Sequence, residues 1–238
     1  MIDINFNFHS EVKVGQDPDT KSPTLKKYHK LLWSKALPNG KLFNLKDDKN
    51  ELYGKSNLYL YHDSDLGFFA LGSDAITHSY RNHKRKKHIT NQIIDEVNDL
   101  FKQGGNIGSY IIFPNKRIEN KQTINASRGC LSKIDDRFDL TLECIKRFYK
   151  NLDSPLYMTL RRYKAFFDLF ENFENYVEFF LLQDLIDNKT NEIKFYLPFD
   201  DFKTAPIFRS TDDYLRYKEG VIEFNYKRKI RINNFLKN

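Results

Sequence analysis

The spacing of apolar residues changes near Arg128, and this change constrains the fold more than any other feature of the sequence. In residues 2–8 every second side chain is apolar, which is the period of a half-buried strand. Beyond Gly129 the apolar side chains recur every three or four positions, which is the period of an amphipathic helix. The sequence therefore predicts an α+β fold in which a strand-rich N-terminal half, an antiparallel sheet plus one helix, packs on a helical C-terminal half.

The length of the chain favours a single domain over residues 1–238, with lobes at 1–130 (β-rich) and 131–238 (α-rich) as the alternative division. The 238 residues include 21 Phe and 14 Tyr, so the chain has ample aromatic surface to bury. We expect one hydrophobic core shared by both halves.

Local patterns place the elements of the first half. Residues 15–24 are rich in turn formers and predict a loop. Residues 58–61 and 68–71 flank a turn-rich segment and predict a hairpin. Residues 89–101 have helical spacing, and Gly104 is placed to end that helix. Residues 110–113 predict a short strand, for which residues 122–125 are the expected partner.

The second half is predicted to be mainly helical. One helix carries Phe138 and Leu142 on its buried face, another begins at Pro155, and the last begins at a cap formed by Ser210 and Asp213. Residues 193–197 predict a strand. Residues 176–186 are apolar on nearly every side, which indicates either a central helix or a surface for a protein partner, and we favour the central helix.

Composition narrows the class of protein. No run approaches the roughly 18 apolar residues of a membrane span, and the first ten residues lack the layout of a signal peptide, so we expect a cytoplasmic protein with no membrane partner. The two cysteines, Cys130 and Cys144, are too few for a disulfide framework and predict free thiols.

Four long segments resemble an uncharacterised bacterial family that is known only as a domain of unknown function. They are SPTLKKYHKLLWSKALPNG at 22–40, IGSYIIFP at 107–114, DRFDLTLECIKRFY at 136–149 and VEFFLLQDL at 177–185. The resemblance covers most of the chain and implies a bacterial protein built as one unit. It implies no activity and no role for any residue.

Two basic segments are candidate contacts for nucleic acid. The chain has a formal charge of +7, and the densest positive run is Arg81, Lys84, Arg85, Lys86 and Lys87, followed by His88. A second run near the C-terminus contains Lys227, Arg228, Lys229 and Arg231. The alternative for the first run is a solvated surface, and the excess of Lys over Arg also fits the residue bias of an AT-rich genome.

The pair Arg81 and His88 also resembles the arginine-to-histidine motif of a small helical ribonuclease superfamily. The resemblance implies that this pair acts on a scissile phosphate. The strands predicted ahead of the motif depart from the all-helical fold of that superfamily.

The junction between residues 123 and 137 is a candidate site for an anionic ligand. Asn125, Arg128 and Arg137 supply an amide and two guanidinium groups near a helix start, and Asp136 lies beside them. Together with Arg81 and His88, the residues Arg128 and Asp136 are the candidate catalytic groups. The alternative is a capped helix start in which Arg128 pairs with Asp135, Asp136 or Asp184.

Metal and cofactor chemistry have no support in the sequence. The histidines all precede residue 89, but none has a chelating spacing, so no metal is expected. There is no Walker loop, no dinucleotide-binding fingerprint and no Ser-His-Asp signature, and we expect no cofactor.

Three hypotheses for function follow, in order of preference. The first is a nucleic-acid-associated protein, RNA-directed and of defence or toxin type, that contacts RNA or DNA through the two basic runs. The second is an enzyme that acts on a phosphate-bearing small molecule at Asn125, Arg128, Asp136 and Arg137. The third is a non-enzymatic module that binds a protein through residues 176–186.

Overall fold

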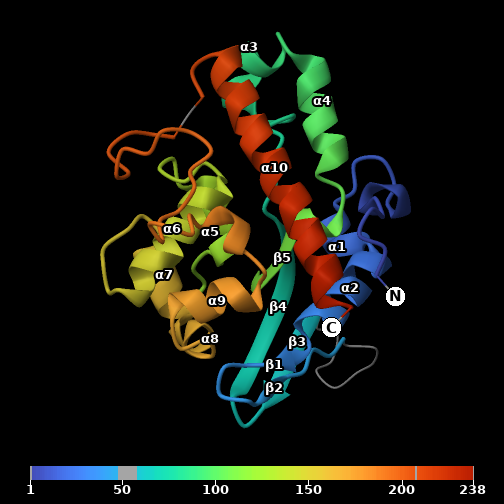
Figure 1. Ribbon diagram of the computed structural model, residues 1–238, viewed down its shortest axis with the longest axis vertical. Coiled ribbons are helices and arrows are strands. Elements are labelled where there is room, and N and C mark those ends of the chain that lie inside the picture. Colours follow the sequence, from blue (N-terminus) through green and yellow to red (C-terminus); the bar gives the residue numbers. More distant parts are fainter. Residues whose placement is uncertain (1, 48–57, 207, 238) are drawn as a thin grey trace.

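A computed structural model describes residues 2–47, 58–206 and 208–237 and has the predicted α+β character (Figure 1). All strands of the described residues lie between residues 35 and 114, whereas helices occur along the whole chain. The α-helices are α1 (Pro18–Lys21), α2 (Pro23–Trp33), α3 (Lys87–Thr90), α4 (Ile94–Gln103), α5 (Ile124–Cys130), α6 (Phe138–Tyr149), α7 (Tyr157–Arg162), α8 (Lys164–Asp168), α9 (Phe173–Phe179) and α10 (Thr211–Phe235). Short 3₁₀ turns are η1 (Phe8–Glu11), η2 (Lys84–Lys86), η3 (Ile107–Ser109) and η4 (Gln183–Leu185).

Two small antiparallel sheets form the β part of the molecule. The first pairs β1 (Lys35–Ala36) with β2 (Leu42–Phe43), and the second has the order β3 (Leu60–Ser64), β4 (Gly67–Ala75) and β5 (Tyr110–Pro114). The predicted hairpin is confirmed: β3 and β4 pair from Leu60 opposite Leu71 to Ser64 opposite Gly67. The predicted strand at 110–113 is also confirmed and pairs with β4.

Helix α10 closes the outer edge of the sheet. Strand β5 is buried along its whole length although it pairs on one side only. The fully buried Arg228 of α10 donates from Nη1 to the carbonyl oxygens of Gly108 and Tyr110, both at 2.9 Å. This covering satisfies carbonyl groups at the unpaired edge of the sheet. In Figure 1, helices α5–α9 lie on one side of α10, and α1, α2 and α4 lie on the other.

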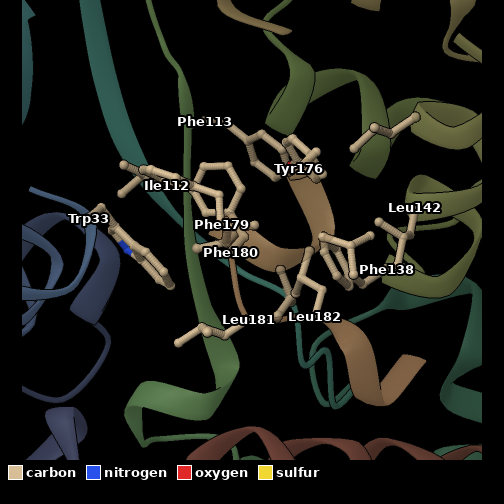
Figure 2. Packing of buried hydrophobic residues seen from close by; sticks show 14 of the residues in the cluster. Trp33, Ile112, Phe113, Phe138, Leu142, Tyr176, Phe179, Phe180, Leu181 and Leu182 are labelled. Atoms are coloured by element: carbon tan, nitrogen blue, oxygen red, sulfur yellow. The ribbon is translucent and has the colours of Figure 1, made fainter. Parts of the chain in front are cut away.

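The main core joins both halves of the chain through aromatic side chains. Figure 2 shows Trp33 of α2 facing Phe179 and Phe180. The ring centroids are 6.2 and 5.3 Å from the indole. Aromatic pairs at such distances stabilise a core beyond the area that they bury. The shared core therefore accounts for the docking of the two halves.

Residues 176–186 are buried, but they are not one helix. Helix α9 ends at Phe179, and Leu181 has a φ of +54°, a value that stops an α-helix. The predicted burial within the protein is confirmed, whereas the predicted continuous helix is wrong. Because the protein itself covers these side chains, the segment does not offer the partner surface of the third hypothesis.

Three expected features of the N-terminal half are wrong. Residues 2–8 form turns before η1 and no strand. Residues 15–24, expected to be a loop, hold α1 and the start of α2, because Asp17 and Ser22 accept hydrogen bonds from backbone N–H groups as N-caps. Residues 122–125 are not a strand, because Thr123 caps α5. The half also holds more helices than the one expected.

The remaining differences concern the ends of elements. The helix expected at 89–101 is split into α3 and α4, and residues 193–197 form only one bridge, between Ile186 and Ile193. The start of the last helix is confirmed, since the Ser210 side chain accepts from the N–H of Asp213. Among the described helices none is long and apolar enough to cross a membrane.

Candidate functional site

A polar cleft of about 640 Å³ lies where β4, β5, α1 and the start of α5 meet. Its lining includes the carboxyl groups of Asp19 and Asp74 and the hydroxyl groups of Ser73 and Tyr59. Lys21, Lys26, Asn115 and Asn125 also line it. A concave site with converging polar groups is where ligands bind most often.

A directed chain of hydrogen bonds ends at Asp19. The Trp33 indole donates to His29 Nδ1 at 3.0 Å, so the hydrogen of neutral His29 must be on Nε2. That nitrogen lies 3.0 Å from the Ser73 hydroxyl, which lies 2.8 Å from Asp19 Oδ1. His29 therefore donates to Ser73, and Ser73 donates to Asp19. His29 is an orienting group in this chain and does not act as a base toward Ser73.

Burial determines the protonation states of His29 and Asp19. Burial, reinforced by Arg228, lowers the pKa of His29 to about 3. Burial, together with the negative charges of Asp17 and Asp74, raises the pKa of Asp19 well above its usual value. The cleft thus holds a carboxyl group that retains its proton more strongly than an exposed aspartate does.

Asp74 connects the cleft to a buried arginine. Arg128 Nη1 donates to Asp74 Oδ2, and its Nη2 lies 3.4 Å from Asp136 Oδ1. Arg128 Nε donates to the Thr141 hydroxyl at 2.9 Å. Burial raises the pKa of Asp74 to about 7 against the attraction of Arg128, and the charge of Asp136 adds to the rise. Two carboxyl groups therefore share one guanidinium.

The expected contact of Arg128 with a nearby carboxylate is confirmed for Asp136. The first partner of Arg128, Asp74, was not foreseen. Arg128 is fully buried, so it positions Asp74 from behind and does not itself face a ligand.

Two histidine–carboxylate pairs lie next to this arginine. His78 Nδ1 is 3.5 Å from Asp136 Oδ2, and His83 Nε2 is 3.6 Å from Asp135 Oδ1. Burial lowers the pKa of His78, while Asp136 opposes that effect. Lys86 Nζ is 2.9 Å from Asp135 Oδ2.

The backbone around these pairs is strained. Tyr80, Asp135 and Asp136 have φ values of +59°, +49° and +61°, in a region that residues other than glycine rarely adopt. The Tyr80 hydroxyl donates to the Asp135 carbonyl at 2.6 Å and holds two of the strained residues together. Strain of this kind costs about 1–3 kcal/mol a residue and gathers at functional sites.

The predicted junction residues separate in the structure. Asn125 lines the cleft, and Asp136 pairs with Arg128 and His78. Arg137 is buried and donates from Nε to Asp139 at 3.1 Å, so its guanidinium is engaged and it does not share the cleft. The assignment of Arg137 to the ligand site is corrected.

The N-terminal basic run is largely exposed. Arg81, Lys84, Arg85 and Lys87 are exposed, as is His88. Lys86 is buried against Asp135 and is not available to a nucleic acid, which corrects its assignment. No hydrogen bond or ion pair joins Arg81 to His88 in the described part of the chain, and the fold around them is not the all-helical one of the ribonuclease superfamily.

The C-terminal basic run is mostly engaged within the protein. Arg228 is fully buried, which removes it from the predicted phosphate contacts. Lys227 pairs with Glu223, Lys229 donates to Asn5 at 3.0 Å, and Arg231 grips Asp184 with two bonds of 2.8 and 2.9 Å. Lys227 and Arg231 thus pair with carboxylates, and Lys229 keeps its charge without an acidic partner among the described residues.

Several residues of the cleft escaped sequence reasoning. Asp19 lies in a segment expected to be a loop, and Ser73 and Asp74 are the last polar residues of a strand. His29 and Tyr59 have no motif around them. The polar pair at 73–74, at the end of an otherwise apolar strand, is a signal from which the site could have been found.

Groups of three or more side chains able to hold a metal ion are absent from the described residues. No curated protein and no solved structure matches this sequence. A family model matches residues 2–232, which is nearly the whole chain. The chain therefore belongs to the family of unknown function DUF6994.

Proposed function

We propose that the protein is an enzyme that performs acid–base chemistry on a small phosphate-bearing molecule bound in the polar cleft. The observation that carries the proposal is the presence of two carboxyl groups with raised pKa, Asp19 and Asp74, in the lining of one cleft. A general acid or base works best when its pKa is near the working pH, and for Asp74 that value is about 7. This proposal keeps the substrate class of the second hypothesis and assigns the chemistry to Asp19 and Asp74 of the cleft.

The cleft divides into groups for chemistry and groups for binding. Asp74 is held from behind by Arg128 and exchanges the proton with the substrate, and Asp19 is the second carboxyl group. Lys21 and Lys26 provide positive charge for a phosphate, and Lys26 Nζ lies 5.5 Å from the centre of the Tyr59 ring. The amides of Asn115 and Asn125 offer hydrogen bonds to a polar substrate.

Ligand binding tests the binding half of the proposal. We expect AMP, ribose 5-phosphate or inorganic phosphate to raise the melting temperature of the protein. When Lys21 and Lys26 are both replaced by Ala, the apparent affinity obtained from this shift should fall at least about tenfold. The matched control replaces Lys13 and Lys27, two exposed lysines, by Ala. Equal effects in both double variants contradict the cleft as the phosphate site.

Turnover tests the chemical half. A screen of phosphorylated metabolites followed by NMR should reveal a substrate, and Asp74→Asn should then reduce kcat by about 10²–10⁴-fold while binding persists. An unchanged kcat in Asp74→Asn would remove this residue from the chemistry.

Nucleic-acid binding is the second candidate, and one observation favours it. Arg81, Lys84, Arg85 and Lys87 are exposed within seven consecutive residues, and the half-buried His83 lies between them. Because their charges lie together, they can neutralise neighbouring phosphates of one strand.

A further inference from the structure

Lys35 of β1 lies among three aromatic rings contributed by distant parts of the chain. Its Nζ is 4.4 Å from the ring centre of Phe235, 4.6 Å from that of Phe179 and 5.3 Å from that of Trp33. These rings belong to α10, α9 and α2, respectively. The amine is therefore held in an apolar surrounding built by the tertiary fold.

Lys35 also lines a cavity of about 360 Å³, separate from the polar cleft. Glu178, Asn175 and Gln183 share the lining. The buried amide oxygen Oε1 of Gln183 has no hydrogen-bond partner among the described residues. An unpaired buried acceptor costs free energy, and a bound donor would remove that cost.

The environment of Lys35 favours a partly neutral amine. Glu178 shares the cavity with Lys35 and acts on the amine through its charge. Burial lowers the pKa of Lys35 to about 8, with Glu178 raising it and Arg228 lowering it. The three ring faces attract the ammonium form and so oppose the lowering of the pKa by burial.

We propose that Lys35 is a nucleophilic amine that condenses with the carbonyl group of a small, largely apolar aldehyde or ketone bound in this cavity. The nitrogen lone pair forms a bond to the carbonyl carbon, and the carbonyl π pair moves to oxygen, which takes a proton. The carbinolamine then loses water and leaves a carbon–nitrogen double bond. Solvent water carries the proton from nitrogen to the departing hydroxyl, and the unpaired Gln183 Oε1 accepts a hydrogen bond from the hydroxyl of the carbinolamine.

Reductive trapping tests the proposal directly. The protein is incubated with butyraldehyde and sodium cyanoborohydride between pH 6.5 and 10, and the alkylated lysines are located by mass spectrometry. At pH 7 an amine with a pKa of about 8 is about one tenth neutral. We therefore expect Lys35 to react at least about tenfold faster than the exposed Lys27 in the same sample. A Lys35 rate no higher than that of Lys27 overturns the proposal.

Two variants separate a reactive amine from a structural one. Glu178→Gln removes the negative charge that raises the pKa of Lys35, so trapping at pH 7 should become faster. Phe235→Ala relieves the burial that is the largest cause of the lowered pKa of Lys35, which outweighs the loss of one of the three ring contacts, so trapping at pH 7 should become slower. Because both residues line the same cavity, a general loosening of the structure would move both rates in the same direction. Rates that move together in the two variants contradict the assignment.

Discussion

His29 is neutral in the folded protein because both ring nitrogens are committed to hydrogen bonds in a fully buried position. Its folded pKa of about 3 lies below the value of 6.5 in an unfolded chain. Below pH 6.5, His29 therefore binds a proton in the unfolded chain but stays neutral in the folded protein. The contribution of His29 to stability is complete above pH 6.5 and is lost as the pH falls from there toward 3.

The acid sensitivity of the protein should thus decrease when His29 is replaced by Gln. We expect His29 to account for a loss of about 1.4 kcal/mol in the free energy of unfolding for each pH unit below 6.5. Urea unfolding at pH 7 and pH 5, followed by the fluorescence of the single tryptophan, Trp33, measures the difference. His88→Gln, at an exposed position, should retain the loss seen in the parent. Equal losses in His29→Gln and the parent contradict the assignment.

Arg128 is the second residue whose surroundings predict a large effect. Arg128→Met leaves Asp74 and Asp136 without their shared cation, and we expect unfolding to become easier by about 3–5 kcal/mol. Arg216→Met is the control, because its pair with Asp213 is exposed and should contribute less than about 1 kcal/mol. Adding Asp74→Asn to Arg128→Met should restore part of the loss, which a double-mutant cycle by urea unfolding measures. Strict additivity would show that the pair does not interact.

Of the two carboxylates that contact Arg128, the sequence predicted only Asp136. A buried cation near a helix start needs a carboxylate, and Asp136 was within reach along the chain. Asp74 lies 54 residues earlier than Arg128, and its position follows from the pairing of β4 with β5. Such a contact is set by tertiary packing and leaves no trace in local spacing.

At the scale of elements, periodicity predicted well where one pattern ran unbroken. The helix at Phe138–Tyr149, the hairpin and β5 are where they were expected. Errors arose where backbone conformation or a single side chain overrode the pattern. Leu181 at positive φ ended the helix expected through residue 186, and the cap at Thr123 turned an expected strand into α5. A positive φ at a leucine results from tertiary packing and cannot be predicted from composition.

Helix α10 depends on its cap, since a cap satisfies backbone donors at the start of the longest element. Ser210→Ala should lower the free energy of unfolding by about 1 kcal/mol, because the N–H of Asp213 loses its acceptor. Thr211→Ala, one residue later, removes a side chain that makes no hydrogen bond among the described residues and should change the free energy of unfolding by less than about 0.5 kcal/mol. Thermal and urea unfolding measure both. Indistinguishable variants would mean that the cap adds nothing to the stability of α10.

At the scale of the whole molecule, the two basic runs do not act together. Helix α3, which follows the first run, lies at the end of the long axis away from the C-terminus (Figure 1). The second run is engaged by Glu223, Asn5 and Asp184 or buried. Of the two basic runs, the one at residues 81–87 therefore offers more exposed positive charge to a phosphate strand.

The salt dependence of binding tests whether the basic residues at 81–87 bind nucleic acid. If they do, binding of single-stranded RNA or duplex DNA should weaken steeply with salt, and each lost phosphate contact should reduce the log–log slope by about 0.7–0.9. Replacing Arg81, Lys84, Arg85 and Lys87 together by Ala should weaken binding and flatten the slope. Replacing Lys13, Lys27, Lys189 and Lys237, which are also exposed but scattered, removes the same charge and should do much less. Equal losses in the two quadruple variants would show a diffuse attraction, and no binding by the parent at low salt would leave the cleft as the functional site.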